Sequence, residues 1–216
     1  MVELYTYWRS SAAFRARIAL NLKGVAYQPR VINLVRDGGE QNKVEYRRLN
    51  PNGRVPTLVH DGQVVTQSMA ILEYVNEVFP LPPLLPPDAG GRARVRALAQ
   101  IIVSDVQPLQ NTSVTQYLSD TVRLEKPQIQ AWLREWISRG LVAIEAELAS
   151  SPNTGKFCHG DTPTLADCCL YPQVFSSRRF GVDPDAYRTI SRIARECDRV
   201  DAFVQAAPDN QPDREP

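Results

Sequence analysis

The chain has 216 residues, of which 43% are hydrophobic, so it can bury a core without disulfides and is long enough for one large or two small domains. Its 25 basic and 24 acidic side chains nearly cancel, which argues against nucleic acid or an anionic membrane as a partner. The four cysteines form no Cys-x-x-Cys pair, and we find neither a signal peptide pattern nor an apolar span of membrane length. We therefore expect reduced thiols and a cytoplasmic protein.

The first part of the chain alternates between strand and helix patterns. Residues 2–8 are β-favouring and predict a strand, and Ser10 and Ser11 then precede apolar residues at helical spacing. Lys23-Gly24 is typical of a helix end, after which residues 26–33 predict a second strand. A right-handed crossover makes these two strands parallel.

A second group of elements follows. Residues 41–48 predict a helix, and two short strands at 57–60 and 63–66 flank Asp61-Gly62, a strong hairpin signal. Ser68 can cap a further helix whose apolar residues run to Phe79. The expected order for residues 1–80 is therefore βαβαββα, an α/β domain.

The clearest boundary is rich in proline. Five of the eight residues from Pro80 to Pro87 are prolines, which permits neither a helix nor a central strand, and we assign 81–87 as a linker. Beyond it, apolar residues recur at helical spacing, most clearly between Ile129 and Leu148. Residues 88–216 are thus expected to form an all-helical domain.

Two motifs of the first domain suit a short acidic peptide as ligand. In Arg54-Val55-Pro56-Thr57 we expect a cis Val55-Pro56 bond and free backbone groups on Val55, with which an extended peptide could pair. Gln67-Ser68 places an amide, a hydroxyl and a helix N-terminus together, which favours a carboxylate. The alternatives are an ordinary turn proline and an ordinary N-cap serine.

Together these features resemble a cytosolic glutathione transferase. Residues 160–167 are similar to the capping motif of that family's helical domain, with a capping box from Thr164 to Asp167. The segment Tyr7-Trp8-Arg9-Ser10-Ser11-Ala12-Ala13-Phe14-Arg15-Ala16-Arg17-Ile18-Ala19-Leu20 resembles the zeta-class signature, and similarity continues over nearly the whole chain. The resemblance implies the glutathione transferase fold, a thioredoxin-like domain followed by an all-helical one, and a homodimer.

One position departs from the signature. Where the zeta class has cysteine, this chain has Ala12, so the reacting sulfur is expected to be that of glutathione. Because a free thiol has a pKa of about 8.5, the site must favour the thiolate. By resemblance Ser10 is the first choice for the hydroxyl that stabilises it, with Ser11 as neighbour or substitute; the alternative for either serine is simple helix capping.

The resemblance also implies substrate and glutathione contacts elsewhere. The substrates that the resemblance implies are maleyl acids, which carry carboxylates. Guanidinium groups are suited to bind carboxylates, and Arg9 and Arg179 are the candidates for this contact. Gln110 and Asn111 are expected near glutathione, with Asp105 reaching it across a dimer interface. The alternative for these three residues is hydrogen bonding between helices. His60 and His159 have no metal-ligand spacing, and we expect no metal.

The expected activity is glutathione-dependent cis–trans isomerisation of maleylacetoacetate by reversible thiolate addition. Isomerisation of maleylpyruvate is the nearest alternative, although Thr112-Ser113 stands where those enzymes are associated with arginines. Three further readings stay open: a zeta-like transferase acting on small α-halo acids, a detoxifying conjugating transferase, and a glutathione-binding module without activity.

Overall fold

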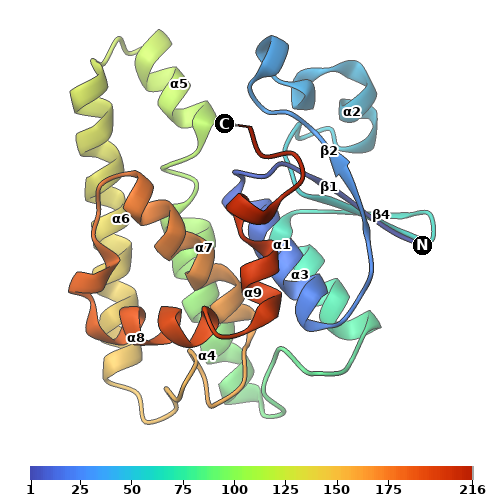
Figure 1. The fold of residues 1–216 in the computed structure, drawn as a ribbon. Helices are drawn as coiled ribbons and strands as arrows, with labels where there is room; N and C mark the ends of the chain where they lie inside the picture. Colours follow the sequence, from blue (N-terminus) through green and yellow to red (C-terminus); the bar gives the residue numbers. More distant parts are fainter. Residues whose placement is uncertain (216) are drawn as a thin grey trace. The chain divides into compact units, whose positions relative to one another are not determined.

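A computed structural model describes residues 1–215, which form two compact units (Figure 1). The first unit contains residues 1–83 together with residues 200–215, and the second contains residues 84–199. The division falls inside the proline-rich segment, within which Leu84 is buried. The predicted boundary between an α/β part and a helical part therefore lies close to the observed division.

A four-stranded sheet forms the centre of the first unit. Its strands, in the spatial order β2-β1-β3-β4, are β2 (Gln28–Val31), β1 (Val2–Thr6), β3 (Thr57–His60) and β4 (Gln63–Thr66). β1 runs parallel to β2 and antiparallel to β3, as the crossover and hairpin predict. Asp61 and Gly62 both have positive φ, 48° and 83°, which suits the two-residue turn that joins β3 to β4.

Helices lie against both faces of this sheet. α1 (Ser11–Leu22) and α3 (Ser68–Val78) pack together, and α2 (Val44–Leu49) follows two short 3₁₀ turns. Because side chains alternate along a strand, Leu4 is fully buried while the neighbouring Tyr5 lies on the opposite face, 5.9 Å from the ring of Tyr46 in α2. The order βαβαββα and the thioredoxin-like fold are confirmed.

The C-terminal residues belong to this first unit, which differs from the predicted division at residue 88. α9 (Asp201–Ala206) packs along α1, and Phe203 and Ala206 are fully buried (Figure 1). A 3₁₀ turn, η5 (Pro208–Asn210), continues the chain. The physical reason is burial: α9 is too short to hold its apolar face alone, and α1 supplies the surface that covers it.

The second unit is helical throughout its regular elements. These are α4 (Ala89–Gln100), the π-helix η3 (Ile101–Val106), α5 (Thr112–Asp120), α6 (Lys126–Ala149), α7 (Leu165–Arg179), the 3₁₀ turn η4 (Pro184–Ala186) and α8 (Arg188–Cys197). The predicted apolar stripe of α6 is confirmed, since Leu133, Ile137 and Leu141 are buried. The predicted capping box is confirmed as well: Asp167 accepts hydrogen bonds from both the backbone N–H and the hydroxyl of Thr164.

All four cysteines are buried free thiols, as predicted. Burial raises the pKa of Cys158 and Cys197 well above the ordinary value, so these thiols stay protonated at neutral pH. Among residues 1–215, no helix is both long enough and apolar enough to cross a membrane.

Candidate active site

The loop between β1 and α1 places the serine pair at a helix N-terminus. Ser10 is the N-cap of α1, and its Oγ accepts a hydrogen bond from the backbone N–H of Ala13 at 3.2 Å. A capping hydroxyl still has a proton to donate. Ser11 is the first residue of the helix, so its backbone N–H lies among those that an α-helix leaves without an intrahelical partner. The arrangement favours a negatively charged group beside Ser10.

The predicted cis bond between Val55 and Pro56 is present. Within the described chain, no hydrogen bond is made by the backbone N–H or C=O of Val55, which lies two residues before the start of β3. The preceding peptide is held firmly, because the Arg54 carbonyl accepts bonds from the Tyr46 hydroxyl and from Nδ2 of Asn50, both at 2.7 Å. Burial raises the pKa of Tyr46, which keeps its hydroxyl protonated as a donor.

The Gln67-Ser68 motif differs in detail from the expectation. Gln67, not Ser68, is the N-cap of α3; it has φ of 68°, and its side chain is exposed and makes no capping bond. Ser68 is buried, and its Oγ accepts a hydrogen bond from Nη1 of Arg15 at 2.8 Å. Ser68 faces a guanidinium on α1 because the two helices pack together. The amide of Gln67 is thus the more open group at this helix N-terminus.

The structure links these three elements through the first unit. Val55 shares an apolar cluster with Tyr7, against which Trp8 packs, directly before Arg9 and Ser10 in the chain. Ser68 is linked to the same helix that Ser10 opens, through Arg15. Arg15 was not predicted as a contact of Ser68. The signal that could have identified it is a basic residue within an otherwise apolar helical stretch.

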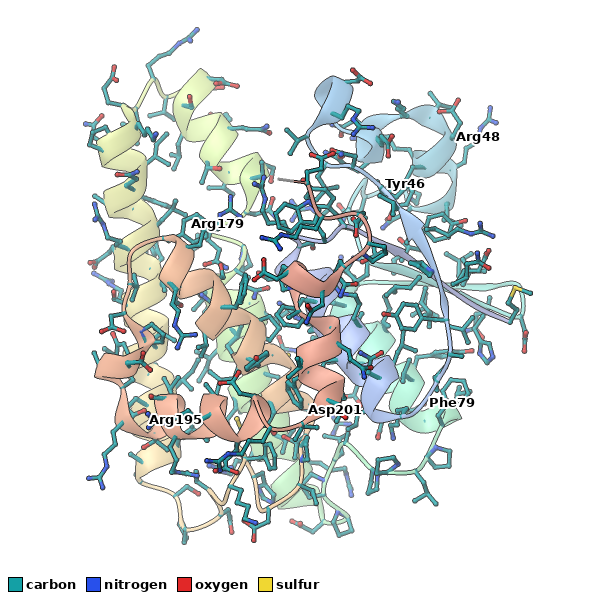
Figure 2. All side chains as sticks on the ribbon, in the orientation of Figure 1. Tyr46, Arg48, Phe79, Arg179, Arg195 and Asp201 are labelled. Carbon is teal, nitrogen blue, oxygen red and sulfur yellow. The ribbon has the colours of Figure 1, made fainter. Side chains whose placement is uncertain are left out.

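The two candidate arginines are both exposed and both lie over a neighbouring aromatic ring. The guanidinium carbon of Arg9 is 5.5 Å from the centroid of Trp8, and that of Arg179 is 5.3 Å from the centroid of Phe180. Figure 2 shows Arg179 at the end of α7. Stacking on an aromatic ring limits the rotamers that a guanidinium can adopt.

The remaining candidates lie in the helical unit. Asp105 is exposed within the π-helix η3, a type of distortion found frequently at functional sites. Gln110 exchanges side-chain hydrogen bonds with Gln173, at 3.1 and 3.2 Å, and Asn111 caps α5 by accepting from Ser113. The alternative role, hydrogen bonding between helices, therefore describes the contact of Gln110 with Gln173 on α7, whereas the contact of Asn111 lies at the start of its own helix. Gln173, fully buried on α7, was not recognised as the partner of Gln110.

Comparison with known proteins places these features in context. Residues 1–77 match the N-terminal domain model of glutathione S-transferase, and residues 126–206 match the C-terminal one. The chain is 44% identical to maleylacetoacetate isomerase of Pseudomonas aeruginosa, across 98% of both chains.

Two solved structures are similar over almost the whole chain. One is the holo form of a maleylpyruvate isomerase described as a bacterial zeta-class glutathione S-transferase, with 47% identity, a TM-score of 0.95, and coverage of 99% of this chain and 100% of that one. The other is maleylacetoacetate isomerase from Methylobacterium extorquens with bound malonate and glutathione, with 40% identity, a TM-score of 0.94 and the same coverage. The zeta-class resemblance inferred from the first helix is confirmed.

Proposed function

Because this chain belongs to the glutathione S-transferase family, we propose that it is a glutathione-dependent isomerase that converts maleylacetoacetate to its trans isomer, fumarylacetoacetate. The observation that carries the proposal is the likeness to isomerases of this name along the full chain, combined with a serine pair at the N-terminus of α1. Fold alone would not establish activity, and the site residues supply the chemical argument.

The first unit offers groups that fit glutathione, an extended peptide with a carboxylate at each end. The unbonded N–H and C=O of Val55 are suited to pair with its backbone, as an added strand does. The exposed amide of Gln67 and the N-terminus of α3 are suited to its γ-glutamyl carboxylate, with Ser68 beside them. We assign glutathione binding to these residues and Pro56.

The chemistry requires a stabilised thiolate. Bound glutathione supplies a sulfur that adds reversibly to the cis double bond, so that rotation about the resulting single bond and elimination leave the trans alkene. Ser10 donates its hydroxyl proton to that sulfur, and the N-terminus of α1 adds a favourable electrostatic field. Ser11 is the adjacent ligand. Ala12 leaves no protein thiol to compete.

The substrate's carboxylates need fixed cations. We assign Arg9 and Arg179 to this task, since each guanidinium is exposed and stacked on its neighbouring ring. Gln110 and Asn111 are assigned to contacts with glutathione, and Asp105 to a contact with it from the partner subunit of a homodimer. The four reduced thiols support a cytoplasmic setting for the reaction.

Maleylpyruvate is the second candidate substrate. It is supported by the 47% identity to a maleylpyruvate isomerase, slightly above the 44% shared with the maleylacetoacetate enzyme. Both reactions need the same thiolate and the same carboxylate-binding arginines, and the substrates differ only in the length of the chain beyond the maleyl group. Relative kcat/KM for the two acids decides between them.

The test is loss of the absorbance of each maleyl acid, with and without glutathione, in wild type and in Arg179→Ala. We expect turnover only with glutathione, and a KM for the maleyl acid raised roughly 10-fold to 100-fold in the variant, because a charge-assisted hydrogen bond contributes about 1.5–3 kcal/mol.

Arg178→Ala is the matched control, because Arg178 is also exposed at the end of α7 but faces Asp185, 3.6 Å away. Equal KM values in the two variants would remove Arg179 from the substrate site. Binding of glutathione without turnover of either maleyl acid would overturn the isomerase and favour a binding module.

A further inference from the structure

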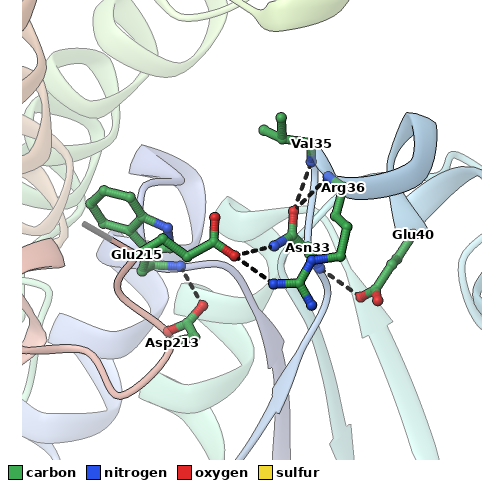
Figure 3. Close-up of polar contacts among 7 residues, drawn as sticks. Asn33, Val35, Arg36, Glu40, Asp213 and Glu215 are labelled. Carbon is green, nitrogen blue, oxygen red and sulfur yellow. Dashed lines mark hydrogen bonds and ion pairs between the residues drawn. The ribbon is translucent and has the colours of Figure 1, made fainter.

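The C-terminal segment, residues 207–215, lies against the loop that precedes the serine pair. Asp213 accepts a hydrogen bond from the backbone N–H of Trp8 at 2.9 Å. Glu215 accepts from Nδ2 of Asn33 at 3.0 Å and from the guanidinium of Arg36 at 2.9 Å, at the end of β2 (Figure 3). The segment thus contacts two loops of the first unit.

The same loop is held from its other side by a buried arginine. Arg17 of α1 is fully buried and donates to the carbonyls of Tyr7 and Trp8, at 3.3 and 3.1 Å, and to the hydroxyl of Thr6. Its Nε donates to the carbonyl of Ala206 at 2.9 Å, at the end of α9. One guanidinium therefore joins the β1–α1 loop to the end of α9, directly before the C-terminal segment.

The charge of Arg17 makes this arrangement depend on Asp213. Burial lowers the pKa of Arg17 to about 10, whereas Tyr27 and, to a smaller extent, Asp213 act in the opposite direction; of these two groups, Asp213 is the carboxylate. A buried charge without a compensating partner is unfavourable, so loss of the Asp213 carboxylate destabilises the buried position of the Arg17 guanidinium. The peptide between Tyr7 and Trp8 would then lose both sets of contacts.

We propose that Asp213 and Arg17 are positioning residues for the reaction: they fix the backbone at Tyr7 and Trp8, and thereby the placement of Arg9 and Ser10 against glutathione. The inference rests on the proposed function, because it gives the C-terminal segment a role in thiolate stabilisation. Neither residue touches the reacting atoms. Only Arg9 separates Trp8 from Ser10, and a displacement of about 1 Å at a reacting group can cost about 100-fold in rate.

The experiment uses the full chain with Asp213→Asn, which keeps an acceptor for Trp8 but removes the charge, and Asp213→Ala, which removes both. The control is Asp209→Asn, because Asp209 lies in the same segment and pairs only loosely with Arg214, at 3.4 Å on the surface. Three quantities are measured: hydrogen exchange of the Trp8 amide, the pKa of bound glutathione from thiolate absorbance, and kcat and KM for a maleyl acid.

For Asp213→Ala we expect exchange of the Trp8 amide to be at least about tenfold faster, the pKa of bound glutathione to rise, and kcat to fall about tenfold. Asp213→Asn should show a smaller change in exchange and the same direction in thiol pKa. Asp209→Asn should match wild type in all three. If Asp213→Ala does not fold, Asp213→Asn alone decides through the thiol pKa.

Faster exchange at Trp8 with an unchanged thiol pKa and unchanged kcat would overturn the proposal, because the contact would then serve folding only. The proposed function fails in a different way: wild type that binds glutathione as a thiolate but turns over no maleyl acid removes the isomerase. A thiol pKa raised in the Asp213 variants of such a protein would still support the positioning role.

Discussion

Ser10 has two roles at one position, as the N-cap of α1 and, in our proposal, as the hydroxyl donor to the glutathione thiolate. A single hydroxyl can do both, because its oxygen accepts from Ala13 while its proton remains to be donated. Any substitution that removes the side chain therefore changes helix stability and chemistry together, and the two effects must be separated by choice of variant.

We predict that Ser10→Gly lowers kcat/KM for glutathione-dependent turnover by roughly 10-fold to 100-fold, the loss of one charge-assisted bond of about 1.5–3 kcal/mol. Glycine is a tolerable N-cap, so the free energy of unfolding should change by only a few tenths of a kcal/mol, whereas Ser10→Ala should lose about 1 kcal/mol as well. Steady-state kinetics and urea unfolding provide the two measurements.

Ser11→Ala tests which of the two serines stabilises the thiolate. Alanine is a good helix former at the first helical position, and the capping bond of α1 is made by Ser10, so this variant should leave the helix intact. If Ser11→Ala loses more activity than Ser10→Gly, the assignment of the thiolate-stabilising hydroxyl passes from Ser10 to Ser11.

The contact partners of polar residues were the hardest feature of the site to predict from the sequence. Zeta-class similarity pointed to Ser10, and the Gln67-Ser68 motif predicted a carboxylate site. Neither gave a reason to expect that Ser68 would face Arg15, or that Gln110 would pair with Gln173. Both contacts join residues more than fifty positions apart, and only the packing of whole helices decides which side chains meet.

Helix packing in the second unit depends on a close approach between α6 and η3. Gly140 of α6 lies against Val106, and a Cβ at this position would be 2.1 Å from Cγ2 of that valine. Both residues are buried. The absence of a side chain therefore lets the long helix approach the π-helix that carries Asp105 and precedes Gln110 in the chain.

Gly140→Ala is expected to lower the free energy of unfolding by about 1–3 kcal/mol, the usual cost of adding a methyl group to a packed core. In a Val106→Ala background the same substitution should be neutral or stabilising, because alanine exceeds glycine in helix propensity by about 1 kcal/mol. Chemical denaturation of the four proteins of this double-mutant cycle measures the coupling.

An additive cycle, with equal effects of Gly140→Ala in both backgrounds, would contradict a clash with Val106.

Most helices and turns were predictable from the sequence, because their local signals are strong. The Thr164 to Asp167 capping box, the apolar stripe of α6 and the Asp61-Gly62 turn all appear where the sequence predicts them. The π-helix was not, since no local residue pattern distinguishes it from the α-helix that precedes it.

At the scale of the whole molecule, the chain returns to its first unit after completing the helical one. α9 buries Phe203 and Ala206 against α1, and the carbonyl of Ala206 is a partner of the buried Arg17. The core of the first unit is therefore formed jointly by residues 1–83 and by α9.

We predict that a chain ending at residue 199 loses the structure of its first unit, because Arg17 would keep its charge without Ala206 and Asp213, and α1 would expose an apolar face. A chain ending at residue 211 retains α9 and should remain folded. Circular dichroism, thermal unfolding and hydrogen exchange of α1 distinguish the two. Equal stability of both truncated chains would show that α9 contributes nothing to the first unit.

The sequence by itself determined the features that short-range chemistry controls: strands and helices of the α/β part, the proline-rich boundary, the buried thiols, and through its signature the family and the glutathione chemistry. Only the tertiary structure decided where residues 200–215 lie and which side chains contact Arg15 and Arg17. It also decided that the N-cap of α3 is Gln67 and not Ser68. The physical reason is that burial of an apolar face or of a charge depends on the surface opposite it. That surface is supplied by residues far away in the chain.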